Sequence, residues 1–109
     1  MRDEIAAMPK TAQGALEAAM TRYERREELP RDVKQLAPVL VSGESFALRE
    51  LRVTAEGQEF RLLFVQVGEY HHVCLRLYAF EKKRQKTGKQ AFDVARGRLA
   101  SWLEIHKKA

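Results

Sequence analysis

Three arginines lie within otherwise apolar segments, and their chemistry is the first feature to explain. Arg52, Arg61 and Arg76 each fall in a stretch whose side chains alternate as in a β-strand. An arginine in a packed sheet must pair with a carboxylate or face a polar groove. If adjacent strands present the guanidinium groups to one concave surface, that surface would bind a phosphate, because arginine binds phosphate oxygens in a bidentate manner.

A structural alternative accounts for the same arginines. Long cationic side chains can reach a strand edge and pair with carboxylates there. The candidate partners are Glu50, Glu59 and Glu69. Strand alternation places Glu50 on the face of Arg52, and Arg76 on the face of Tyr78 and Phe80. The residues alone leave the two interpretations open.

Positive charge is concentrated in the second half of the chain. The net charge is +5, yet residues 1–44 hold seven basic and eight acidic residues, whereas residues 45–109 hold thirteen and seven. The densest part is a short basic run, Lys82, Lys83, Arg84 and Lys86, with Lys89 just beyond. A localised basic patch is typical of nucleic-acid binding, and the alternative is a solvated surface turn.

Length and composition exclude several classes of protein. The 109 residues predict a single domain over 1–109. No apolar run is long enough to span a membrane, and the N-terminus lacks the apolar segment of a secretory signal. Cys74 is the only cysteine, which excludes an internal disulfide and favours a reducing, cytoplasmic location. We therefore expect a cytoplasmic protein with no membrane partner.

Other residues with reactive side chains form no convincing site. His71 and His72 are adjacent, so a strand would point them to opposite faces, and they make a poor metal pair. Cys74 and Trp102 lie in apolar patterns that favour core packing. The sequence has no glycine-rich phosphate loop and neither the HExxH nor the GxSxG motif. We expect no metal and no cofactor.

The first third of the sequence predicts helices. Apolar residues over 11–28 recur on one helical face, and Pro30 would stop that helix. Residues 3–8 predict a short turn of helix before it, and residues 31–37 another after it.

The rest of the sequence predicts a sheet followed by a helix. Residues 46–53, 60–67 and 72–80 predict three strands joined by short polar turns, which makes them an antiparallel meander. Residues 88–107 predict an amphipathic helix, which a capping box at Thr87 would start. The predicted fold class is α+β, with helices before and after a three-stranded sheet.

In this order, the motifs resemble those of a known superfamily. The matching segments are LRELRV (residues 48–53), FRLLF (60–64) and LYAFEKKRQKT (77–87), followed by Ala95 and Arg98. Together they resemble the RelE/ParE superfamily of toxins, and most closely its HigB-like, phage-derived branch. The combination is specific, although each motif alone would be weak, and it covers about residues 33–103.

The resemblance implies a fold and an activity. The fold would be an N-terminal helical hairpin on a small curved antiparallel sheet, with a C-terminal helix. The activity would be that of a ribosome-dependent mRNA interferase, held inactive by a cognate antitoxin, which we expect to be of the helix-turn-helix type. By motif, Arg52 and Arg61 would be catalytic on the concave face with Glu50 beside them. Residues that would bind RNA are Arg49, Lys82, Lys83, Lys86 and Lys89.

The implied chemistry is attack by an RNA 2′-hydroxyl on the adjacent phosphate. Preorganised cations would stabilise the charge that develops on the phosphorane, a role for Arg52 and Arg61. No residue is an obvious proton acceptor, and Tyr78 and Glu50 are the candidates. We expect replacement of either arginine by alanine to abolish growth arrest while the protein stays folded.

The sequence departs from the family pattern in three places. The family opens with a strand before its helical hairpin, whereas this sequence begins at the hairpin, so we expect either that the sheet lacks an edge strand or that the start codon is misplaced. Tyr78 and Ala79 replace a His-Gly pair, and Gly88 replaces a proline. The alternative functions are a gyrase inhibitor of the ParE type, a non-catalytic nucleic-acid-binding module, and a decayed toxin that keeps only the fold.

Overall fold

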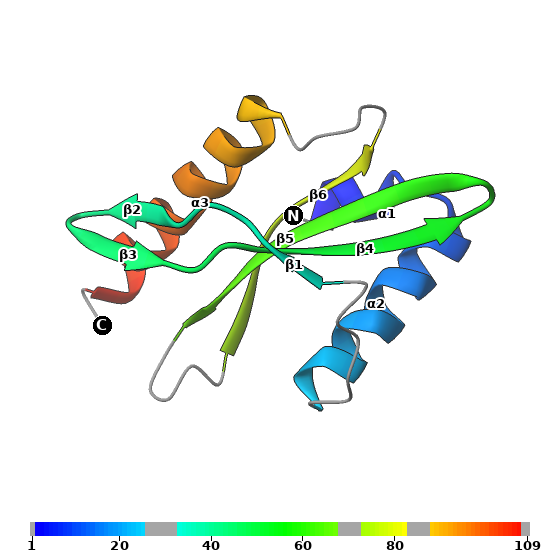
Figure 1. Ribbon diagram of the computed structural model, residues 1–109, viewed down its shortest axis with the longest axis horizontal. Coiled ribbons are helices and arrows are strands. Elements are labelled where there is room, and N and C mark those ends of the chain that lie inside the picture. The colour runs from blue at the N-terminus through cyan, green and yellow to red at the C-terminus, as the bar shows by residue number, and fades with distance from the viewer. Residues whose placement is uncertain (1, 26–32, 68–72, 83–87, 108–109) are drawn as a thin grey trace.

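Helices at both ends of the chain pack against an antiparallel sheet. The computed structural model describes residues 2–25, 33–67, 73–82 and 88–107 (Figure 1). The elements are α1 (Arg2–Ala6), α2 (Lys10–Glu24), β1 (Val33–Gln35), β2 (Val39–Val41), β3 (Glu44–Phe46), β4 (Arg49–Ala55), β5 (Gln58–Val67), β6 (Val73–Lys82) and α3 (Lys89–Lys107). The predicted α+β class is confirmed.

The strands form one sheet and one separate hairpin. The sheet has the order β1-β4-β5-β6 with every pair antiparallel, and β2 pairs only with β3. The predicted meander is therefore present as β4-β5-β6. Glu56 and Gly57, at φ 53° and 75°, form the two-residue turn between β4 and β5. Two positive φ values match the right-handed twist of paired strands, which explains why this hairpin is tight.

The α2 helix covers one face of the sheet. Its buried residues are Ala12, Leu16, Ala19 and Met20. They pack against inward-facing strand residues, namely Leu51, Phe60, Leu62, Phe64 and Ala79. The predicted amphipathic face is thus confirmed over Lys10–Glu24, and the rest of the predicted helix lies mostly outside the described residues.

The α3 helix and the β2–β3 hairpin cover the other face. Figure 1 shows them side by side, away from α2. The helix contributes three buried residues, Ala91, Ala95 and Leu99, and these pack with Leu63, Val65 and Leu77 from the sheet and Val39, Val41 and Phe46 from the hairpin. The sheet thus separates two cores, which explains why β5 is buried on both faces.

The edge strand β1 differs from the prediction. Val33, Lys34 and Gln35 pair with Leu51, Glu50 and Arg49 of β4, so the helical turn predicted here is wrong. A segment of three residues is too short to show the alternating pattern that predicts a strand. Pairing with the neighbouring β4 keeps this segment extended.

The β2–β3 hairpin is the second difference. The strand predicted over residues 46–53 is divided, because Phe46 ends β3 and β4 begins at Arg49. Ser42 and Gly43 have φ values of 51° and 81° and form another two-residue turn. A serine-glycine pair between short apolar runs is a recognised hairpin signal, so this element was detectable in the sequence.

A register shift in β5–β6 changes which side chains share a face. Leu63 lies opposite Tyr78, but Phe64 lies opposite Arg76, so Leu77 is an extra residue in β6. An insertion of one residue sends the side chains beyond it to the other face. Arg76 therefore lies on the α2 face and Tyr78 on the α3 face, and the prediction that they share a face is wrong.

Candidate functional site

Two of the predicted catalytic arginines lie side by side. Arg52 in β4 is the direct cross-strand partner of Arg61 in β5, and Phe80 in β6 completes the row. All three residues belong to the face of the sheet that carries Leu63 and faces α3. Arg61 is buried, whereas Arg52 is partly exposed. Strand alternation thus brings these arginines together as the sequence predicts.

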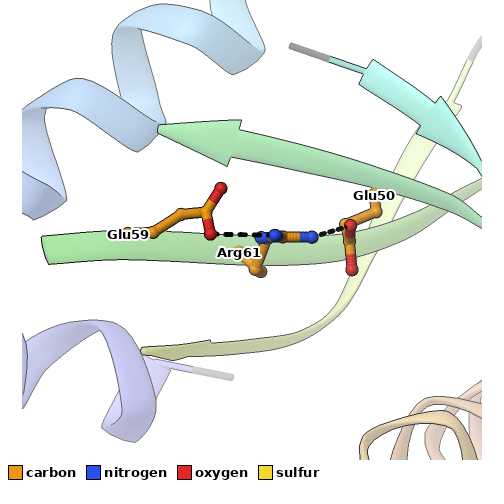
Figure 2. A network of polar contacts seen from close by, with 3 residues as sticks. All are labelled: Glu50, Glu59 and Arg61. Carbon is orange, nitrogen blue, oxygen red and sulfur yellow. Dashed lines mark hydrogen bonds and ion pairs between the residues drawn. The ribbon is translucent and has the colours of Figure 1, made fainter. Parts of the chain in front are cut away.

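The Arg61 side chain is held between two carboxylates. Its Nη1 donates to Glu50 Oε1, and its Nη2 donates to Glu59 Oε2 at 2.9 Å. Figure 2 shows the three side chains nearly in line, with the guanidinium group in the middle. The exposed fractions of the side chains are 8% for Arg61, 1% for Glu50 and 38% for Glu59. At Arg61, the structure therefore agrees with the structural alternative, in which a strand arginine pairs with carboxylates.

This pairing decides what Arg61 can do. A buried charge needs a partner because burial removes its hydration, and here two carboxylates supply the compensation. The buried Nε of Arg61 has no hydrogen-bond partner among the described residues. Glu50, Glu59, Arg61 and the adjacent Arg52 together carry no net charge at neutral pH. Arg61 would have to leave a carboxylate before it could bind a phosphate directly.

An aromatic pair adjoins the arginine row. Tyr78 and Phe80 are stacked with their ring centroids 5.3 Å apart and an interplanar angle of 22°. Both rings are partly buried against the α3 core. The row therefore places one partly exposed arginine, Arg52, on the same face as an aromatic pair. Cationic and aromatic groups together are the combination that binds single-stranded RNA by phosphate contact and base stacking.

Arg98 of α3 fixes the position of Tyr78. Its guanidinium carbon lies 5.3 Å from the Tyr78 ring centroid, and its Nη1 donates to the backbone carbonyl of Leu77 at 3.0 Å. The same group forms an ion pair with Glu4 of α1. Burial raises the pKa of Glu4, but its hydrogen bonds, including that from Arg98, bring the pKa below its usual value. This contact was not predicted from the sequence, although Arg98 lies on the same face of α3 as Ala91 and Ala95.

The predicted basic rim is only partly described. Register places Lys82 opposite Glu59 at the end of β6, and Lys89 is exposed at the start of α3. Lys83 and Lys86 lie outside the described residues, as do His71 and His72, which the sequence indicates to be a poor metal pair. No cluster of three metal-ligating side chains occurs in the part of the chain that the structure describes.

The remaining two arginines lie on the α2 face, away from Arg52 and Arg61. Arg76 pairs with Glu17 and Glu24 of α2, the latter at 3.8 Å. Arg49 donates to the Gln66 amide oxygen at 3.0 Å. The structure therefore does not bring the predicted RNA-binding residue Arg49 to the arginine row.

Cys74 is also on the α2 side of the sheet, half-buried with the α2 core. Burial raises the pKa of its thiol, and the nearby Glu24 carboxylate raises it further. A thiol that stays protonated is a weak nucleophile. The predicted packing role of Cys74 agrees with this environment.

Comparison with known families identifies the chain. The family model described as phage-derived protein Gp49-like (DUF891) matches residues 3–100. The chain belongs to the Gp49-like family. This family is part of the RelE-like group of toxins, and its members usually pair with an antitoxin. Comparisons with curated proteins and with solved structures gave no match. Among the described residues of this Gp49-like protein, no helix is long and apolar enough to cross a membrane.

Proposed function

We propose that this Gp49-like protein is the toxin of a type II toxin–antitoxin pair, and that it is a ribosome-dependent mRNA interferase of the HigB-like kind. The family supports a toxin-like function. The observation that carries the RNA-cleaving part is the row of Arg52, Arg61 and Phe80 across three strands, with Tyr78 stacked on Phe80.

The reaction requires the protein to align the 2′-hydroxyl, to stabilise the negative charge of the phosphorane, and to support proton transfer. The 2′-oxygen of the RNA attacks the adjacent phosphorus, the bond from phosphorus to the 5′-oxygen breaks, and a 2′,3′-cyclic phosphate forms. The 2′-hydroxyl loses its proton, and the departing 5′-oxygen gains one. Negative charge grows on the phosphorane between these events, so a fixed cation beside the phosphate lowers the barrier. Binding to the ribosome would align the RNA for attack.

Arg52 takes the phosphate-binding role in this proposal. Its side chain is partly exposed, and it lies in the same row as Phe80, with Arg61 of β5 between them. Arg61 acts as a positioning residue, because its guanidinium group is bonded to Glu50 and Glu59. Glu50 is too deeply buried to reach a substrate. The proton-transfer role therefore falls to Tyr78, which Arg98 holds in place.

One observation favours a second function. The four charges of the Arg52–Arg61 group cancel, which weakens its attraction for a polyanion. A non-catalytic toxin that inhibits a protein target such as DNA gyrase needs no phosphate site. Such a toxin would have the same fold and would bind its protein target through its surface.

Two reactions with purified protein distinguish these functions. The first incubates the protein with translating ribosomes and a defined mRNA, and maps 5′ ends by primer extension. The second follows supercoiling by DNA gyrase. The proposal predicts new mRNA 5′ ends only when ribosomes are present, with normal supercoiling. Inhibited supercoiling with intact mRNA would favour the second function and contradict the proposal.

A further inference from the structure

A hollow lies at the far end of the sheet from the Arg52–Arg61 row. Its volume is about 530 Å³, and its apolar wall comes from Phe46, Val67, Trp102 and Leu103. Its polar lining residues are Glu44, Ser45, Arg49 and Gln66. Because β5 rises by about 3.3 Å per residue, Val67 lies roughly 20 Å from Arg61. The lining residue nearest to the row is Arg49, three residues before Arg52 in β4 and so roughly 10 Å from it.

Arg49 differs from the other strand arginines that line a pocket or core. Arg61 and Arg76 are bonded to carboxylates, whereas Arg49 donates to the neutral amide oxygen of Gln66. That oxygen also accepts from the Tyr23 hydroxyl at 3.1 Å. Among the described residues, Arg49 has no carboxylate partner. A partly buried guanidinium group with spare donors attracts an anion.

The strand geometry beside the hollow suits an extended ligand. The β4–β5 ladder ends at the pair of Arg49 and Phe64, whereas β5 continues with β6 as far as Val67. Before Arg49, the chain continues from the β2–β3 hairpin, and Phe46 and Ala47 of this segment also line the hollow. A short segment in the hollow would lie alongside β5 and place alternate side chains against Trp102 and Arg49.

We propose that this hollow binds a short acidic, apolar peptide segment of the partner antitoxin. One bulky apolar side chain would fill the space beside Trp102, and a neighbouring carboxylate would pair with Arg49. The inference rests on the toxin–antitoxin part of the proposed function and not on RNA cleavage. It also assigns Arg49 to a protein partner, where the sequence predicted RNA.

The charges of the hollow favour a peptide over RNA. Glu44 also lines it, so its wall carries one cation and one anion. RNA brings a phosphate with every nucleotide, and successive phosphates would meet Glu44. A peptide with an isolated carboxylate can pair with Arg49 while its apolar side chain buries against Trp102 and Leu103.

Trp102 provides the test, because it is the only tryptophan. The full chain is titrated with the peptide acetyl-Leu-Glu-Phe-amide, with its glutamine analogue, and with a tetrauridylate as the RNA probe. We expect a saturable change in Trp102 fluorescence with the acidic peptide. Binding of the glutamine analogue should be about tenfold weaker, because a charge-assisted pair is replaced by a neutral hydrogen bond.

Variants of the protein distinguish a specific pair between Arg49 and the peptide carboxylate from a general effect of the protein's positive charge. Arg49→Gln should weaken binding of the acidic peptide about tenfold, whereas Arg96→Gln, the same change at an exposed site on α3, should leave it unchanged. Glu44→Gln, also exposed, should strengthen binding by roughly twofold, since it removes a repulsive charge. This last variant keeps the test valid if Arg49→Gln does not fold.

Three results would overturn the inference. They are no saturable response up to roughly 1 mM acidic peptide, equal affinity for the acidic peptide and its glutamine analogue, and tighter binding of the tetrauridylate at Trp102. None depends on mRNA cleavage, so failure here is distinguishable from failure of the proposed ribonuclease function.

Discussion

Arg52 and Arg61 are direct cross-strand partners, so two positive charges lie opposite each other in the sheet. Like charges in this position destabilise a sheet. Glu50 and Glu59 flank Arg61 and offset the repulsion. The fold therefore depends on this ion network, and the same network sets the charge that any RNA substrate would encounter.

Replacement of Arg61 by alanine should destabilise the protein. The change leaves Glu50 buried without its cation, and breaking a buried pair costs about 3–5 kcal/mol. Urea denaturation followed by circular dichroism measures the free energy of unfolding. The same experiment tests the sequence-based expectation that Arg61→Ala stays folded.

Arg52→Ala is the matched control, because Arg52 is partly exposed on the same face. We expect it to change the free energy of unfolding by less than about 1 kcal/mol. Equal stability of the Arg61→Ala variant and the wild type would show that the Glu50–Arg61 pair does not support the fold.

Tyr78→Phe should separate proton transfer from stacking. The phenylalanine ring keeps the contacts with Phe80 and Arg98 but lacks the hydroxyl group. Because a positioned acid or base contributes typically 10²–10⁴-fold, we expect mRNA cleavage to slow by at least about 100-fold while RNA binding is kept. Single-turnover cleavage and filter binding measure the two effects.

The alanine variant completes this comparison. Tyr78→Ala removes the ring as well, so it should weaken both cleavage and binding. Cleavage by Tyr78→Phe at the wild-type rate would exclude the phenolic hydroxyl from proton transfer and leave Tyr78 with a stacking role only.

Glu4 should make stability depend on pH. Burial raises its pKa, yet its hydrogen bonds and Arg98 lower it more, so the folded-state pKa lies below the usual 4.5. The ionised carboxylate therefore stabilises the fold above pH 4.5, and this contribution is lost as the pH falls through the folded-state pKa. Because Arg98 is 40% exposed, the pair contributes at most about 1 kcal/mol.

The comparison of wild type with Glu4→Gln measures this contribution. Their unfolding free energies should differ at pH 7 and converge as the pH falls through the folded-state pKa of Glu4. A difference that stays constant or grows on acidification would contradict the assignment of the lowered pKa to the folded state.

Elements with strong periodicity were predictable from the sequence. The helices α2 and α3 and the strands β4, β5 and β6 all have apolar patterns long enough to specify a type of structure. The three-residue strands lack such patterns and depend on tertiary pairing. At β2–β3, the Ser42-Gly43 pair indicated a turn. The pattern of residues 46–53 favoured one continuous strand, but the structure divides that segment between β3 and β4.

The candidate site was predictable only as far as the strand register held. Alternation correctly put Arg52 and Glu50 on one face and, through β5, brought Arg61 beside them. It failed at Arg76, because a one-residue bulge leaves no mark in the periodicity. The sequence suggested Glu50 and Glu59 as partners, but only the packed structure shows that Arg61 takes both.

Ribosome-dependent cleavage by an Arg52 variant tests the central claim most directly. Purified wild type, Arg52→Ala and Arg22→Ala, the last at an exposed site on α2, are each incubated with translating ribosomes and one defined mRNA, and single-turnover rates are measured. We predict that Arg52→Ala remains folded and loses at least about 100-fold in rate, while Arg22→Ala cleaves like the wild type. Wild-type cleavage by folded Arg52→Ala, or no cleavage by any of the three proteins, would contradict the proposed phosphate site.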